Sequence, residues 1–218
     1  MRTILLGLAL YVGTIHTSVA QRRPAAKEHR WAVGLLLGTT SFSGATDATG
    51  PDGEKLTFTP YRPAITGLRV SHGGNGLRLD ASVQFGRPGL AFRGAQGSGA
   101  GAPDAGLLVV GESVYHLWTF GARATTELLR LEGAASLRPS LGLALERWSA
   151  PASPPRLIVG GEAGLGLEVP LKGPLVAEFT GALGYTPRSP FRREDVPEEF
   201  RLRSTWRKSI MGGVSWRF

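Results

Sequence analysis

The chain has 218 residues, a formal net charge of +8 and no cysteine. Without cysteine it can hold no disulfide framework, thiolate metal site, cysteine nucleophile or lipidated-cysteine anchor. The basic residues are scattered along the chain and many lie beside acids, so we expect no nucleic-acid partner.

The first twenty residues have the layout of a secretory signal peptide. Arg2 supplies the positive start, residues 4–12 are almost wholly apolar, and residues 17–20 end in the small residue Ala20. This apolar stretch is shorter than the roughly 20 residues that a membrane-spanning helix needs. We therefore predict an exported protein that is cleaved after Ala20, with a short periplasmic segment at residues 21–29.

From residue 30 onward the dominant hydrophobic period is two, the period of a β-strand. The 31 glycines and 15 prolines are spread over the whole chain, which favours strands and turns over long helices. The alternation predicts eight strands, at residues 30–43, 62–72, 76–87, 109–127, 135–148, 157–170, 174–186 and 205–218. The fourth is the least regular, and we expect Val114, Trp118 and Phe120 to share its apolar face.

The connections between these strands alternate in length. Long ones are expected at residues 44–61, 88–108, 149–156 and 187–204, and short ones near residues 72–75, 130–133 and 172–173. This alternation is typical of an even-numbered antiparallel barrel with both termini on one side. Outer-membrane barrels have short periplasmic turns and longer external loops, so the pattern predicts an all-β transmembrane barrel, an up-and-down meander with periplasmic termini.

Alternation alone also fits a secreted, soluble, lipocalin-like binding barrel, whose apolar face would be its core. Charges on the polar face favour the membrane barrel, because buried charges need partners and a narrow lumen would pair them. Acids concentrate on the fifth to seventh strands, and bases on the second to fourth and the eighth. The expected lumen network comprises Arg69, Arg78, Asp80, Arg123, Arg138, Glu146, Glu162, Glu168, Glu178 and Arg207.

Aromatic residues fall at strand ends, as in the two interfacial girdles of a membrane barrel. One rim is expected to hold Trp31, Trp216 and Phe218, and the external rim Phe85, Tyr185 and Trp206. Arg147 and Lys208 interrupt the apolar face near the external rim, where long basic side chains reach the headgroup layer. We expect these two to be possible contacts for lipopolysaccharide phosphates.

The C-terminus resembles the assembly signal of bacterial outer-membrane barrels. Apolar residues occupy alternate places before a terminal phenylalanine, at Ile210, Val214, Trp216 and Phe218. Together with the signal peptide and the eight-strand layout, residues 30–218 resemble the small outer membrane protein beta-barrel domain family, of the OmpX, OmpW and OmpA-transmembrane type. This resemblance implies insertion by the barrel-assembly machinery and residence in a Gram-negative outer membrane, but no particular activity.

No catalytic, cofactor-binding or metal-binding site is expected. Outer-membrane lipid deacylases have a serine two residues after the histidine, and neither His72 nor His116 has one there. No cluster of histidines and carboxylates that could bind a metal stands out. An eight-stranded lumen is just wide enough for side chains to fill, so inward Arg and Glu would block a general pore. We therefore predict a monomer in contact with outer-membrane lipid, with a structural or surface-interaction role; a narrow porin-like channel for small solutes stays open.

Overall fold

The computed structural model describes residues 31–50, 53, 55–74, 76–94, 107–131, 135–150 and 153–218. The predicted signal peptide and the segment at residues 21–29 lie outside the described residues. Among those described, no helix is long and apolar enough to cross a membrane.

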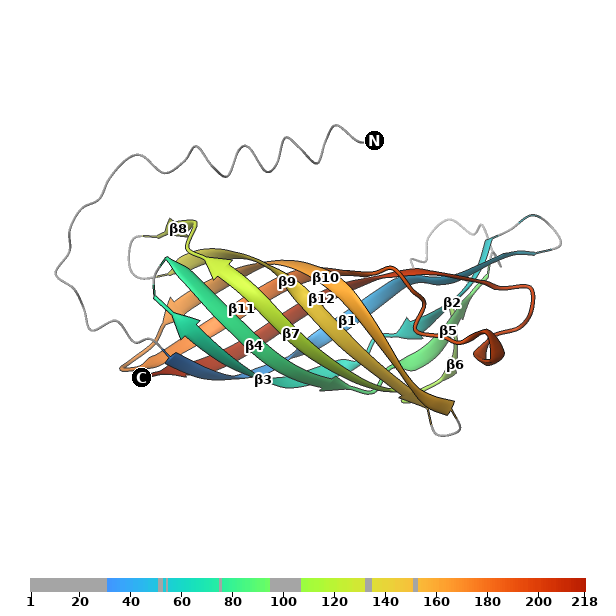
Figure 1. The fold of residues 1–218 in the computed structure, drawn as a ribbon, viewed down its shortest axis with the longest axis horizontal. Helices are drawn as coiled ribbons and strands as arrows, with labels where there is room; N and C mark the ends of the chain where they lie inside the picture. Colours follow the sequence, from blue (N-terminus) through green and yellow to red (C-terminus); the bar gives the residue numbers. More distant parts are fainter. Residues whose placement is uncertain are drawn as a thin grey trace, which may run out of the picture.

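Eight long antiparallel strands close into a barrel (Figure 1), which confirms the predicted fold class. They are β1 (Trp31–Thr49), β3 (Ala64–Gly73), β4 (Leu77–Gly86), β7 (His116–Thr126), β9 (Ser136–Ala150), β10 (Ser153–Pro170), β11 (Leu175–Thr186) and β12 (Arg201–Arg217). Each pairs with the next in this series, and β12 pairs with β1 to close the wall. We call the end that holds Trp31, Phe218 and the tight turns the turn end, and the opposite end the loop end.

Two of the predicted long loops contain strands. β2 (Lys55–Tyr61) pairs with the last residues of β1, β5 (Gly89–Arg93) pairs with β2, and β6 (Leu107–Gly111) pairs with β5. The barrel wall therefore continues at the loop end as a small antiparallel sheet. The loops predicted at residues 44–61 and 88–108 were wrong in this respect, because most of β2 is half-buried on both faces and gives no clean alternation.

The predicted fourth strand is two strands. β6 ends at Gly111 and β7 begins at His116, and between them Ser113 has a φ of 55°, in the left-handed region that breaks a strand. Val114, which was expected on the outer face, packs against the apolar cluster inside the barrel.

The other two long connections are shorter than predicted. β9 and β10 are separated by residues 151–152 alone, since Pro154 and Pro155 lie at a register shift inside β10. The last connection contains the 3₁₀ turn η1 (Arg193–Asp195), and β12 begins at Arg201. A two-residue strand, β8 (Leu129–Arg130), pairs with β9 at the turn end.

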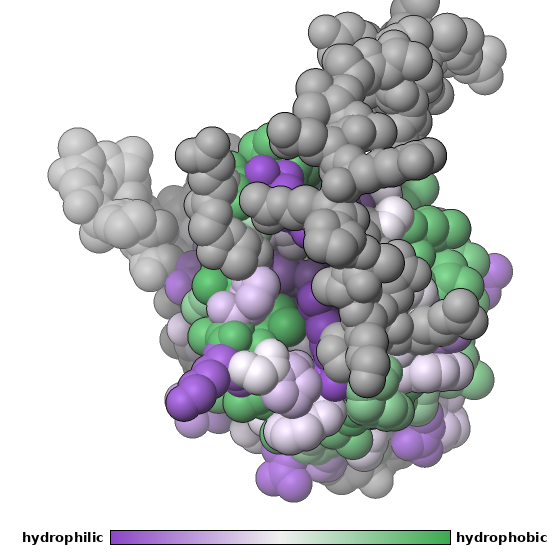
Figure 2. Space-filling model, turned by 90° about the vertical axis from the view of Figure 1, so that its left-hand side faces the viewer, coloured by the Kyte–Doolittle hydropathy of each residue, from purple (hydrophilic) through white to green (hydrophobic). Residues whose placement is uncertain are grey.

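The apolar face of the barrel points outward. Leu35 and Ile210 are 67% and 72% exposed, whereas their neighbours Leu36, Ser209 and Met211 are buried. Leu141, on the opposite part of the wall, is 70% exposed. Figure 2, which looks onto the turn end, shows hydrophilic residues in the middle of the uncovered face and hydrophobic ones at several places around it. This orientation overturns the soluble lipocalin-like alternative, in which the apolar face would form the core.

Candidate functional site

The turn-end half of the lumen is charged. All ten residues of the expected network lie there, each at most 8% exposed: Arg69, Arg78, Asp80, Arg123, Arg138, Glu146, Glu162, Glu168, Glu178 and Arg207. They occupy alternate positions on seven of the eight barrel strands and point away from the outer apolar face. Charges so deeply buried are stable only when they are paired and hydrogen-bonded.

Glu168 on β10 is the centre of one group of ion pairs. Its carboxylate accepts from Arg78, from Arg138 at 3.0 Å and from Arg217 at 2.6 Å. Arg78 also contacts Asp80 at 2.9 Å. The predicted network did not include Arg217, which lies on β12, two strands from β10 in the wall, and whose side chain reaches Glu168.

Arg207 on β12 organises a second group, nearer the loop end. It donates to Glu146 at 2.8 Å and also pairs with Glu162, which in turn accepts from Arg123 at 3.2 Å. The indole Nε1 of Trp148 donates to the other oxygen of Glu146 at 2.9 Å. The second group therefore ends at an aromatic residue.

A third pair joins Arg69 on β3 to Glu178 on β11, and the Ser215 hydroxyl donates to the same carboxylate at 2.8 Å. Strands β3 and β11 are separated by β1 and β12 in one direction around the wall and by four strands in the other. The pair therefore crosses the lumen, as the uneven distribution of acids and bases among the strands suggested.

These side chains fill the charged half. Two cavities remain among them, with volumes of about 20 and 10 Å³, and Arg69, Arg123 and Thr180 line both. A cavity needs about 10–15 Å³ to hold one water molecule. Each of these two cavities therefore has room for about one water molecule.

The loop-end half of the lumen is apolar. Its buried cluster comprises Ala45, Tyr115, Leu117, Trp148, Ile158 and Phe191. Trp148 makes edge contacts with Phe42 and Tyr115, at ring-centroid distances of 5.3 and 6.3 Å. Burial raises the pKa of Tyr115 to about 12.

Sequence reasoning missed this cluster, although a signal for it is present. On β7 the inward residue changes from Thr119 to Leu117, and on β9 from Glu146 to Trp148. Each change keeps the period of two, so the inward face turns from polar to apolar without any break in the alternation. Only the depth of each residue in the barrel distinguishes the two halves.

The outer surface carries aromatic residues at the level of this change. Phe85 contacts Trp118 at 4.9 Å between ring centroids, and Tyr185 contacts Trp206 at 4.8 Å. At the turn end, Trp31 lies 4.3 Å from His72. The outward residues of the predicted assembly signal, Ile210, Val214, Trp216 and Phe218, are 47–72% exposed.

Arg147 and Lys208, the two basic residues expected at the external rim, lie on different sides of the barrel. Arg147 on β9 pairs in register with Trp118 and Leu157, whereas Lys208 on β12 pairs with Leu183 and Ser41. Strands β10 and β11 separate them in the wall. Their backbones are therefore about 14 Å apart along the wall.

The chain matches no protein-family profile, and no curated protein is similar to it in sequence. Its fold is similar to that of Neisserial surface protein A (NspA), with a TM-score of 0.54 and 11% identity over 86% of this chain and 97% of that one. It is also similar to the outer membrane protein OprG from Pseudomonas aeruginosa, with a TM-score of 0.53 and 9% identity over 88% of this chain and 97% of that one. At these identities the likeness concerns the fold, an outer-membrane type of β-barrel.

Proposed function

We propose that the protein is an integral outer-membrane barrel that holds a folded platform at the cell surface, with its turn end in the periplasm. The observation that carries this proposal is the change in lumen polarity at the level of the outer aromatic rim. A barrel wall in lipid is apolar outside and polar inside, whereas a wall in water is the reverse. The two arrangements meet where Trp118 and Trp206 lie, which is where a membrane surface would be.

The length of the apolar band supports this assignment. On β12 the outward face runs from Trp216 at the turn end to Trp206 at the loop end. Ten residue steps cover about 33 Å along a strand. At the usual tilt of about 40° this corresponds to roughly 25 Å along the barrel axis, the height of the apolar band in outer-membrane barrels.

The role that we propose is structural or one of surface interaction, without transport or catalysis. A general pore would have to displace the ion pairs around Glu168 and Arg207 as well as the apolar cluster. The two histidines among the described residues, His72 and His116, lie at opposite ends of the barrel, against Trp31 and Phe85. Neither is therefore close to a second histidine, and the described residues hold no group of three potential metal ligands.

Topology can be tested with single cysteines, because the chain contains none of its own. Glu194→Cys places a thiol in η1 at the loop end, and Lys172→Cys places one in a tight turn at the turn end. A membrane-impermeant maleimide should label the first in intact cells and the second only after the outer membrane is permeabilised. The labelled barrel should also shift in gel mobility on boiling.

Three outcomes would overturn the proposal. Labelling of Lys172→Cys in intact cells with protection of Glu194→Cys would reverse the orientation. Recovery of the chain in the soluble periplasmic fraction would remove it from the membrane. Steady conductance of the wild-type barrel in planar bilayers would replace the closed lumen by a narrow channel.

A further inference from the structure

A group of basic and aromatic side chains lies on the outer surface of the loop-end rim. Trp118 on β7 pairs in register with Phe85 on β4 and with Arg147 on β9. The His116 ring lies 6.2 Å from the Phe85 ring, and the guanidinium carbon of Arg87 lies 5.9 Å from the centroid of Phe85. These five residues lie on β4, β7 and β9 and, for Arg87, directly after the end of β4; together we call them the rim patch.

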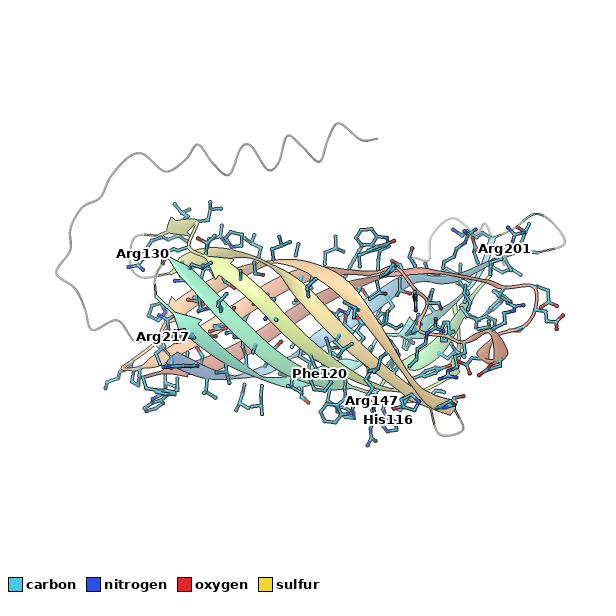
Figure 3. The ribbon with its side chains drawn as sticks, in the orientation of Figure 1. His116, Phe120, Arg130, Arg147, Arg201 and Arg217 are labelled. Carbon is cyan, nitrogen blue, oxygen red and sulfur yellow. The ribbon has the colours of Figure 1, made fainter. Side chains whose placement is uncertain are left out.

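Figure 3 shows Arg147 and His116 together on the outside of the barrel, towards the loop end from Phe120. The register agrees with this view, because Trp118 pairs with Arg147 and His116 pairs with Ser149. Arg147, Trp118 and Phe120 are exposed, whereas His116 is half-buried. The patch is therefore open to whatever surrounds the barrel.

The arginines of the rim patch differ in their pairing from those of the lumen. Among the described residues, no carboxylate lies within 4 Å of the guanidinium of Arg87 or Arg147, whereas Arg69, Arg78, Arg123, Arg138 and Arg207 all have acidic partners. Glu146 is adjacent to Arg147 in sequence but is buried in the lumen, where it pairs with Arg207. Exposed Glu112, in the turn before β7, makes no ion pair with either arginine.

Uncompensated guanidinium groups beside an aromatic surface match the chemistry of a phosphorylated lipid. Guanidinium groups bind phosphate with two parallel hydrogen bonds, and His116 offers a further ring N–H. Strands β4 and β9 are two strand spacings apart, about 10 Å, and Arg87 lies two residues beyond Phe85, so the long side chains of Arg87 and Arg147 extend over the same part of the surface. The rings of Phe85 and Trp118 provide a flat apolar surface for the part of the lipid beneath its headgroup.

We propose that the rim patch binds the phosphorylated headgroup of an outer-leaflet glycolipid, with Arg87, Arg147 and His116 as its anion-binding side chains. This inference rests on the proposed function, which sets the patch at the outer surface of the membrane. The proposal places Arg147 in one site with Arg87 and His116, two residues that the sequence analysis did not group with it. It leaves Lys208 outside the site, because β10 and β11 lie between β9 and β12.

The test measures, by native mass spectrometry, how tightly the full folded chain binds lipid A in neutral detergent. Lipid A is the phosphorylated anchor of lipopolysaccharide. The variant is Arg87→Gln/Arg147→Gln, and the matched control is Lys208→Gln, an exposed basic residue on the outer surface of β12. We expect the double variant to bind lipid A at least about tenfold more weakly than wild type, the range expected when charged hydrogen bonds are lost. The control should bind as wild type does, and dephosphorylated lipid A should bind wild type and double variant equally weakly.

Wild-type affinity in the double variant would overturn the site, and so would equal binding of phosphorylated and dephosphorylated lipid to the wild-type barrel. Displacement of lipid A by millimolar inorganic phosphate would show a free-anion site instead of a lipid site. Boiled and unboiled gel mobility of each variant checks that it is folded. If the double variant binds lipid A as wild type does while Glu194→Cys is labelled in intact cells, the site is wrong and the proposed function stands. If Glu194→Cys is not labelled in intact cells, the proposed function itself is wrong.

Discussion

In the turn-end half of the barrel the interior is charged and the exterior is apolar, whereas in the loop-end half these are exchanged. The same strands run through both halves: β9 turns Glu146 inward in one and Trp148 inward in the other, and β12 exposes Trp206 in one and Arg203 in the other. A strand with alternating polar and apolar residues is stable in lipid when its apolar face points outward, and in water when that face packs into a protein core. In the proposed membrane setting, the level at which the faces exchange is the level at which lipid gives way to water.

The two halves are also stabilised by different forces. In the charged half, stability depends on keeping every buried ion matched, because a buried ion without its partner costs several kcal/mol. In the apolar half, burial and close packing contribute the stability, as in the core of a soluble domain. Substitutions in the two halves should therefore fail in different ways, and this difference can be measured.

The largest effect is expected at Glu168. Glu168→Gln removes the charge shared by Arg78, Arg138 and Arg217, and leaves three guanidinium groups around a neutral amide. We expect the free energy of unfolding to fall by about 4 kcal/mol, the middle of the range for a broken buried pair. Urea unfolding of the barrel in lipid vesicles, followed by tryptophan fluorescence, measures this loss.

Glu194→Gln is the matched control for Glu168→Gln, because it makes the same chemical change on an exposed residue of η1. Its free energy of unfolding should equal that of wild type. If both variants unfolded alike, the charged half would owe little to its ion pairs, and the contrast between the two halves would be lost.

Next in size is Leu117→Ala, in the apolar half. Leu117 is 1% exposed, so its removal leaves a cavity and should cost about 3 kcal/mol. Because the loss falls on the loop-end half, we expect faster proteolysis of the loop-end sheet and loops, while the gel-mobility shift of the barrel on boiling persists. Loss of the mobility shift together with the external structure would mean that the two halves unfold as one unit.

A third pair of variants locates the boundary from outside. Leu141 lies near the middle of the outward face of β9, whereas Leu157 pairs with Arg147 at the rim. Arginine costs about 2–4 kcal/mol at the bilayer midplane and about 0–1 near the surface of the membrane. Leu141→Arg should therefore reduce stability in lipid vesicles by about 2 kcal/mol more than Leu157→Arg, and equal losses would move the boundary.

The sequence predicted the barrel, most strand faces and ten of the charged residues inside the lumen, because all three follow from a period of two, but it omitted Arg217 and placed Val114 on the wrong face. It did not predict the apolar cluster, since Trp148 and Ile158 occupy the same inward register as Glu146 and Glu162. Nor did it predict which charges meet: Glu168 takes its partners from β4, β9 and β12, and these distances depend on strand tilt and closure. Ser113, whose left-handed backbone divides the predicted fourth strand, carries no local signal that would mark it as a break.

The smallest effect is expected at the loop end of β1 and β12, at the ion pair between Asp47 and Arg203. Arg203 donates two hydrogen bonds to the Asp47 carboxylate, at 2.8 and 2.9 Å, and these hold the pKa of Asp47 below its ordinary value of 3.8. A lowered folded-state pKa contributes stability above the unfolded-state pKa, and this contribution is lost as the pH falls through the folded-state pKa.

Since the Arg203 side chain is exposed, water screens the pair, and we expect Asp47→Asn to leave the urea midpoint at pH 7 unchanged within error. For the same reason, the midpoints of wild type and variant should run parallel as the pH is lowered from 5 to 3. A clear loss in the variant at pH 7 that disappears towards pH 3 would show that the pair is shielded from water. The exterior of the loop-end half would then be covered, and the exchange of faces at the aromatic rim could no longer be attributed to a change from lipid to water.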